Sequence, residues 1–112
     1  MDIKKIIPFL DDESLNLLVD KALEGKISES ELVYALPFLS QEHITKVYQA
    51  IVEKRITFKI EVLLPFMSEA LVEDLYSKVI NKETDIIDEA VILPFLKPDK
   101  IKSMFMNYIN KL

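Results

Sequence analysis

The sequence predicts an all-α protein built from one helical-hairpin unit used about three and a half times. Its dipeptide Pro-Phe occurs four times, at Pro8, Pro37, Pro65 and Pro94, after intervals of 29, 28 and 29 residues. Near-constant spacing of this kind is the signature of a repeat. Apolar residues between the motifs follow a helical period, and the chain contains a single glycine, Gly25, whereas all-β folds are rich in glycine turns.

A long helix is predicted after each Pro-Phe step, because apolar residues stand 7, 10, 11, 14 and 15 positions after each proline. These offsets form the i, i+3, i+4, i+7, i+8 stripe of an amphipathic α-helix. In the first copy the stripe is Leu15, Leu18, Val19, Ala22 and Leu23, and in the last copy it is Ile101, Met104, Phe105, Tyr108 and Ile109.

The start of each long helix is marked by its N-cap. Three positions after the proline stand Asp11, Ser40 and Ser68, whose side-chain oxygens can accept a free backbone N–H of the first turn. The fourth copy has Lys97, which lacks such an oxygen, but Pro98 follows at the first helical position, where proline is favoured. We therefore expect four long helices that begin at these residues.

The far ends of the long helices carry Gly25, Lys54, Lys82 and Lys111. Glycine adopts the left-handed conformation that caps many helices. Lysine suits the negative end of the helix dipole. The long helices are therefore expected to stop near these residues.

Shorter helices are predicted to follow, with starts at Ser28, Thr57 and Asp85. Glu31 stands three residues after Ser28, which is the spacing of a capping box. Each short helix should end just before the next proline, near residues 34–35, 62–63 and 91–92, because proline lacks an N–H and restricts the residue before it. Residues 2–7 resemble a shortened helix of this kind. The phenylalanines of the inner corners, Phe38 and Phe66, are expected to be buried.

One domain over residues 1–112 is expected, with repeats beginning near Pro8, Pro37, Pro65 and Pro94. Hairpins of this kind bury their apolar faces only by stacking, as an α-solenoid or as a compact bundle. The Leu-Pro-Phe-Leu step and the capped acidic helix after it resemble short α-helical-hairpin repeats of uncharacterised bacterial proteins. The resemblance covers nearly the whole chain and implies an architecture, not an activity.

Composition narrows the function. The chain has no cysteine, no apolar run long enough for a membrane span and no signal-peptide region at its start, so we expect a cytoplasmic protein without membrane contact. A net charge of −5 argues against a nucleic-acid partner. The exception is residues 97–112, which hold four lysines and one acid and so carry a net charge of +3.

No catalytic, cofactor-binding or metal-binding residue is predicted. The only histidine, His43, falls in the polar first turn of a predicted helix and is expected to be a solvated surface residue. Without cysteine or a second histidine, the usual zinc sites cannot form. With one glycine there is no phosphate-binding loop. We therefore expect a protein that is not an enzyme.

An interaction or assembly module for an unknown protein partner, or for a second copy, is the predicted function. The alternative is a regulator that contacts nucleic acid through its basic last helix. Twelve positions after the proline the inner copies are polar, but the last copy has Met106, which with Lys102 and Tyr108 is the candidate partner-binding set. Either the last helix docks a partner there, or the end of the chain folds back and covers Met106.

Overall fold

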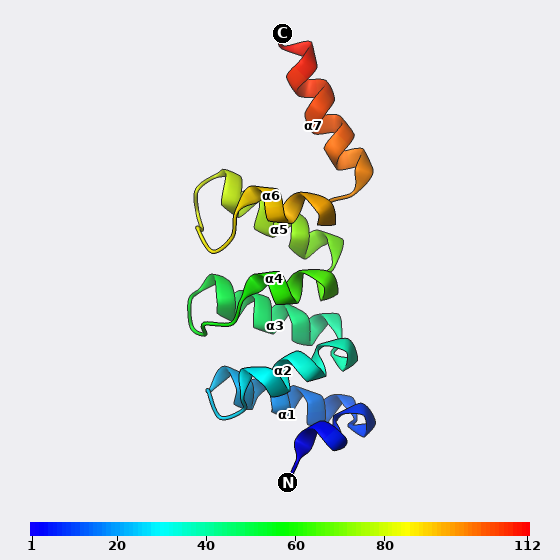
Figure 1. Cartoon of the computed structure of the whole chain (residues 1–112), viewed down its shortest axis with the longest axis vertical. Coiled ribbons are helices and arrows are strands. Elements are labelled where there is room, and N and C mark those ends of the chain that lie inside the picture. Colours follow the sequence, from blue (N-terminus) through cyan, green and yellow to red (C-terminus); the bar gives the residue numbers. More distant parts are fainter. The chain divides into compact units, whose positions relative to one another are not determined.

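The computed structural model describes all 112 residues, of which 71% are helical and none is in a strand, so the predicted all-α class is confirmed. The α-helices are α1 (Asp12–Leu23), α2 (Glu29–Ala35), α3 (Gln41–Val52), α4 (Ile60–Leu63), α5 (Glu69–Ile80), α6 (Glu89–Ile92) and α7 (Pro98–Asn110). Five 3₁₀ turns lie between them: η1 (Ile3–Lys5), η2 (Ile7–Phe9), η3 (Leu36–Phe38), η4 (Leu64–Phe66) and η5 (Leu93–Phe95). Long and short helices alternate along the chain (Figure 1).

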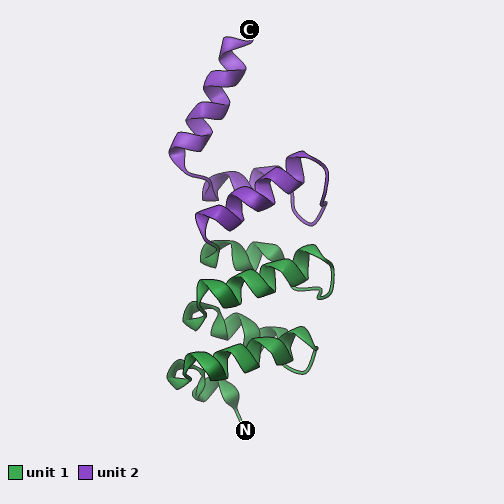
Figure 2. Ribbon diagram, turned by 180° about the vertical axis from the view of Figure 1, so that it is seen from behind, with its two compact units in different colours: residues 1–67 green, residues 68–112 purple.

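The chain divides into two compact units, residues 1–67 and residues 68–112 (Figure 2). In the first unit, α1 packs against α3, and each of these long helices packs against the short helix that follows it, α2 or α4. The turn η1 packs against α2. The core of this unit is formed by the apolar stripes of the two long helices and by residues of the short helices.

The second unit contains one such pair and one additional helix. Here α5 packs against α6, and the stripe of α5 is buried at Val72, Leu75 and Tyr76. The Tyr76 hydroxyl lies 3.4 Å from Glu89 Oε1, and burial, together with this carboxylate, raises the pKa of Tyr76. The helix α7 follows the turn η5 and has no buried residue.

All four predicted N-caps of the long helices are confirmed. The side chains of Asp11, Ser40 and Ser68 accept hydrogen bonds from backbone N–H groups of the first turn. Lys97 stands at the N-cap of α7 without a side-chain bond, and Pro98 is the first residue of the helix. The cap of α2 at Ser28 is also confirmed, including its capping box.

The ends of the long helices share one backbone feature. Gly25 has a φ of 80°, and Lys54 and Lys82, at the same offset from their prolines, have φ values of 59° and 61°. Left-handed geometry costs a lysine more than a glycine, because its Cβ approaches the carbonyl oxygen that follows. Lys54 and Lys82 therefore form the left-handed turns that follow α3 and α5, in addition to complementing the helix dipoles.

Two predicted starts of short helices are wrong. The N-cap of α4 is Lys59, not Thr57, and the N-cap of α6 is Asp88, not Asp85. In each case a buried apolar residue, Phe58 or Ile87, occupies the loop before the helix. The backbone around these buried side chains is irregular. Their burial therefore has a larger effect on where the helix begins than the capping residue predicted from the sequence. The predicted ends of the short helices are confirmed, at Ala35, Leu63 and Ile92.

Each corner is a 3₁₀ turn with proline as its middle residue, and its burial reverses our expectation. The residue before the proline is fully buried at Ile7, Leu36 and Leu64. The phenylalanine after it is exposed, by 86% at Phe9 and 42% at Phe38, so the prediction that Phe38 is buried is wrong. Phe66 is half-buried rather than buried, and Phe95 is exposed. In this tight turn the residues before and after the proline point in different directions, and only the residue before the proline reaches the core.

This difference predicts the effects of two substitutions in one corner. Leu36→Ala is expected to lower the free energy of unfolding by about 2–5 kcal/mol, because it leaves a cavity at a fully buried site. Phe38→Ala removes a larger side chain but should cost less than Leu36→Ala, because much of the ring already faces water. Urea denaturation of both variants measures the two values, and a larger loss for Phe38→Ala would contradict the assignment.

Candidate functional site

The exposed apolar face of α7 is the largest departure from the burial seen in the other long helices. We define the α7 stripe as the residues at the stripe offsets, Ile101, Met104, Phe105, Tyr108 and Ile109. All are exposed except the half-buried Met104. At the offset of Phe105, which is 58% exposed, the other long helices carry Val19, Tyr48 and Tyr76, all buried.

The start of α7 is tied to its own unit by an ion pair. Lys97 Nζ lies 2.7 Å from Glu69 Oε2, at the first turn of α5. The hydrogen bond and the charge of Glu69 raise the pKa of Lys97. Both side chains are more than half exposed, so the pair contributes little to stability. It leaves Lys100, Lys102 and Lys111 as the cations of this segment without an ion pair.

The three predicted partner-binding residues are all exposed, but the helix does not bring them onto one face. Lys102 and Met106 are four residues apart and so lie on the same side of α7. Tyr108 is two residues beyond Met106 and faces the other way, with the α7 stripe. Met106 is 44% exposed, so the alternative that the end of the chain covers it is wrong. The stripe, and not Met106, is the larger apolar surface, and the stripe offsets in the sequence already marked it.

A second group of exposed apolar side chains lies at the corners of the first unit. Phe9, Tyr34 and Phe38 are all exposed, and the rings of Tyr34 and Phe38 contact each other at a centroid distance of 6.4 Å. An aromatic pair in a tilted arrangement stabilises the corner by itself. Tyr34 and Phe38 therefore contact each other as well as facing solvent.

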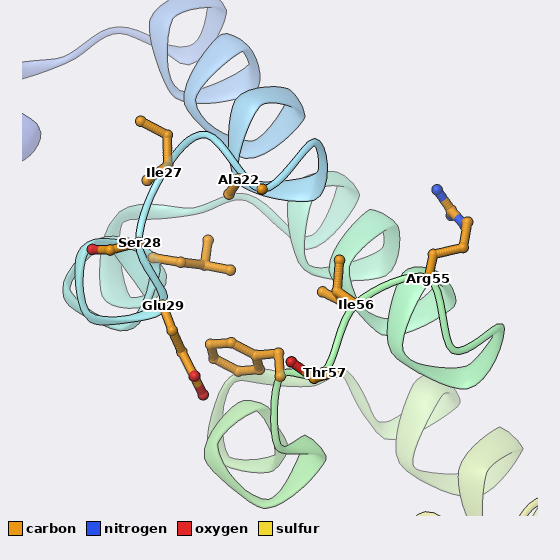
Figure 3. Close-up of a pocket in the computed structure, with 10 residues that line it drawn as sticks. Ala22, Ile27, Ser28, Glu29, Arg55, Ile56 and Thr57 are labelled. Atoms are coloured by element: carbon orange, nitrogen blue, oxygen red, sulfur yellow. The ribbon is translucent and has the colours of Figure 1, made fainter.

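A cavity of about 270 Å³ lies between the loops that follow α1 and α3, both in the first unit (Figure 3). Its lining is Ala22, Gly25, Ile27, Ser28, Glu29, Leu32, Arg55, Ile56, Thr57 and Phe58. Ala22, Leu32 and Phe58 are the buried residues of this lining. The only arginine, Arg55, is at its edge and is paired with Glu53 at 3.1 Å. The cavity has an apolar floor, and the polar side chains of its lining are Ser28, Glu29, Arg55 and Thr57.

His43 is buried, with 2% of its surface exposed, so the prediction of a solvated surface histidine is wrong. Its Nδ1 accepts a hydrogen bond from the Ser40 backbone N–H at 3.4 Å, and Ser40 Oγ accepts one from the His43 N–H at 3.3 Å. The histidine thus takes the place that glutamate or glutamine holds in a capping box. Sequence reasoning missed this because it considered only carboxylates on the same helix as partners.

The other ring nitrogen of His43 faces α1. Its Nε2 lies 3.6 Å from Oδ1 of Asp12, the first residue of that helix. This distance is longer than a hydrogen bond. The ring is therefore buried and lies close to the first turns of both α1 and α3. Its geometry is that of a structural residue.

Comparisons with known proteins add no functional assignment. No protein-family model, no curated protein and no solved structure matches this chain. The structure holds no group of three or more acidic, histidine or cysteine side chains arranged to bind a metal ion. None of its helices combines the length and the apolar character that a membrane crossing requires.

The burial of His43 predicts a stability effect in place of a neutral one. His43→Ala removes the acceptor of the Ser40 N–H and empties a buried site, and it should cost about 1–3 kcal/mol of unfolding free energy. The control is Gln49→Ala, an exposed change on the same helix that should stay within about 0.5 kcal/mol. Thermal and urea unfolding measure the stability of the two variants. Equal stability would contradict the burial of His43.

Proposed function

We propose that this chain is a non-catalytic helical-repeat protein that acts as a protein–protein interaction or assembly module, with the α7 stripe as its partner-binding surface. One observation carries the proposal. At the first three stripe offsets every residue of α1, α3 and α5 is buried, whereas in α7 Ile101 and Phe105 are exposed and Met104 is half-buried. An exposed, contiguous apolar surface is typical of an interaction site.

The chemistry of the stripe supports a protein partner. Phe105, Tyr108 and Met104 are of the residue types enriched at the centres of protein interfaces. Lys100 and Lys102 stand beside the stripe and supply a polar rim. Of the three predicted residues, only Tyr108 belongs to the stripe, whereas Lys102 and Met106 lie on a neighbouring side of α7. The hairpins behind α7 act as a scaffold whose repeated units stack as a solenoid or a bundle.

A variant in the centre of the stripe tests the proposal. Phe105→Asp should keep the fold, because the ring is mostly exposed, and should abolish binding of partners captured from an extract of the source cells. The matched control is Ser103→Asp, an exposed position on the opposite face of α7 that receives the same charge. Affinity capture with quantitative mass spectrometry compares the three proteins. Partners that are retained equally by both variants would show that the stripe is not the docking surface.

Nucleic acid is the second candidate partner, favoured by the three unpaired lysines of residues 97–112. The pairing of Lys97 with Glu69 removes one cation from that set, and the apolar stripe has no use in phosphate contact. We expect no binding to a short DNA duplex or to single-stranded RNA at physiological salt. Fluorescence anisotropy over a salt series measures this, and an affinity that falls steeply with salt would favour the nucleic-acid function instead.

A further inference from the structure

We propose that the α7 stripe binds the N-terminal segment, Asp2–Phe9, of a second copy of this chain, so that copies associate head to tail. This inference rests on the proposed function, because it names the partner of the same surface. Two surfaces of the chain carry this inference, the α7 stripe and the N-terminal segment. Each is more exposed than the equivalent residues of the inner repeats. In the inner repeats, a long helix packs against a short helix, and the two exposed surfaces correspond to these two partners.

The first half is the long-helix side. In α1, α3 and α5 the stripe is covered in part by the short helix that follows, and these pairs are α1 with α2, α3 with α4, and α5 with α6. The α7 stripe has the same offsets and the same apolar character, but none of its residues is buried. Within this chain, therefore, the established cover for such a stripe is a short helical segment that ends in a Pro-Phe corner.

The second half is the short-helix side. The residue two positions before the proline is Ala35, Leu63 or Ile92 in the short helices, and each of these is fully buried. The N-terminal segment has Ile6 at this position, and it is 38% exposed. Its backbone is right-handed helical, as in the other three. Ile6 therefore has the same backbone conformation as three buried residues but is itself exposed.

The burial of Ile7, next to Ile6, shows which face of the N-terminal segment is already packed. Ile7, one position before the proline, is fully buried, as are Leu36 and Leu64 at the same offset. The N-terminal segment is thus packed correctly on the side of the hairpins that follow it. Ile3, three residues before Ile6 and so on the same side of the segment, is only half-buried. We call Ile3 and Ile6 the Ile3–Ile6 ridge, which is the apolar part of this segment that is not fully buried.

A second copy supplies that long helix. The α7 stripe of one copy takes the place that α1 has for α2, and the Ile3–Ile6 ridge of the next copy takes the place of the short helix. Each copy then offers one surface of each kind, which makes the contact heterologous and allows open chains of copies. A two-fold pairing of α7 with α7 would instead leave Ile6 uncovered.

Charge gives the contact a distinctive salt dependence. Lys4 and Lys5 belong to the N-terminal segment, and Lys100 and Lys102 flank the α7 stripe, so like charges approach each other. Each copy also carries a net charge of −5, which adds a repulsion between whole molecules. Added salt screens both terms, and association should become stronger as salt rises. Binding of an acidic protein or of nucleic acid to α7 would show the opposite trend.

Complementation between two variants of the full chain tests the inference. Ile6→Asp damages the ridge and keeps α7, and Phe105→Asp damages the stripe and keeps the ridge. Sedimentation velocity should show association of the wild type that grows with concentration and salt, and monomers for each variant alone. An equal mixture of the two variants should form a one-to-one dimer and no longer species, because only one intact contact remains. Ser103→Asp should associate like the wild type.

The outcomes separate this inference from the proposed function. If Phe105→Asp loses association or captured partners while Ile6→Asp behaves as the wild type, α7 is a docking surface for another occupant, and only the present inference is wrong. If the wild type stays monomeric at every concentration and salt, the inference is also wrong. If Phe105→Asp retains every interaction, both proposals fail. Circular dichroism and melting curves establish that each variant is folded.

Disulfide trapping provides a measurement that does not depend on the fold of an aspartate variant. The chain has no cysteine, so Ile6→Cys and Phe105→Cys introduce single thiols. Mixing the two variants under mild oxidation should give the mixed disulfide in preference to either symmetric one. A random distribution of the three products, or a predominance of the dimer of Phe105→Cys, would overturn head-to-tail association.

Discussion

The structure depends on one constraint: a long amphipathic helix needs a neighbouring segment to remove its apolar stripe from water. Burial of a large apolar side chain contributes about 1.5–3 kcal/mol, and each stripe presents several of them. In α1 and α3 this burial is shared between the adjacent long helix and the following short helix. The short helices are too short to be stable alone, so packing against the apolar stripe of a long helix is what stabilises them.

The corners show how the chain reaches this packing. Proline ends each short helix, and the 3₁₀ turn that contains it returns the chain for the next long helix. A backbone hydrogen bond closes each turn, as from the Leu39 N–H to the Leu36 oxygen at 3.2 Å. The buried residue is the one before the proline, which points inward from the end of the short helix. The phenylalanine is kept in all four copies although its exposure ranges from half-buried to nearly complete, so burial in the core does not account for its presence.

Polar side chains of α1 and α3 add contacts between the hairpins of the first unit. His43 caps its own helix and also faces Asp12 of α1. Lys46 Nζ lies 2.8 Å from Asn16 Oδ1 and 3.0 Å from Asp20 Oδ1, which again joins α3 to α1. These bonds set the register of two helices whose apolar stripes alone would allow sliding. They give the only histidine of the chain, which is buried, contacts within its own helix and with α1.

Much of the architecture followed from the sequence alone. The spacing of proline, the helical offsets and the caps at Asp11, Ser40 and Ser68 predicted the class, the four long helices and the ends of the short ones, because these features act through the local backbone. The α7 stripe was also visible, since its offsets repeat those of Leu15 and Val19. Tertiary structure decided the rest. Whether Phe38, His43 or Met106 is buried depends on which segment packs over it, and such contacts join residues far apart in the sequence. The starts of α4 and α6 moved for the same reason, because Phe58 and Ile87 are buried in the loops before them.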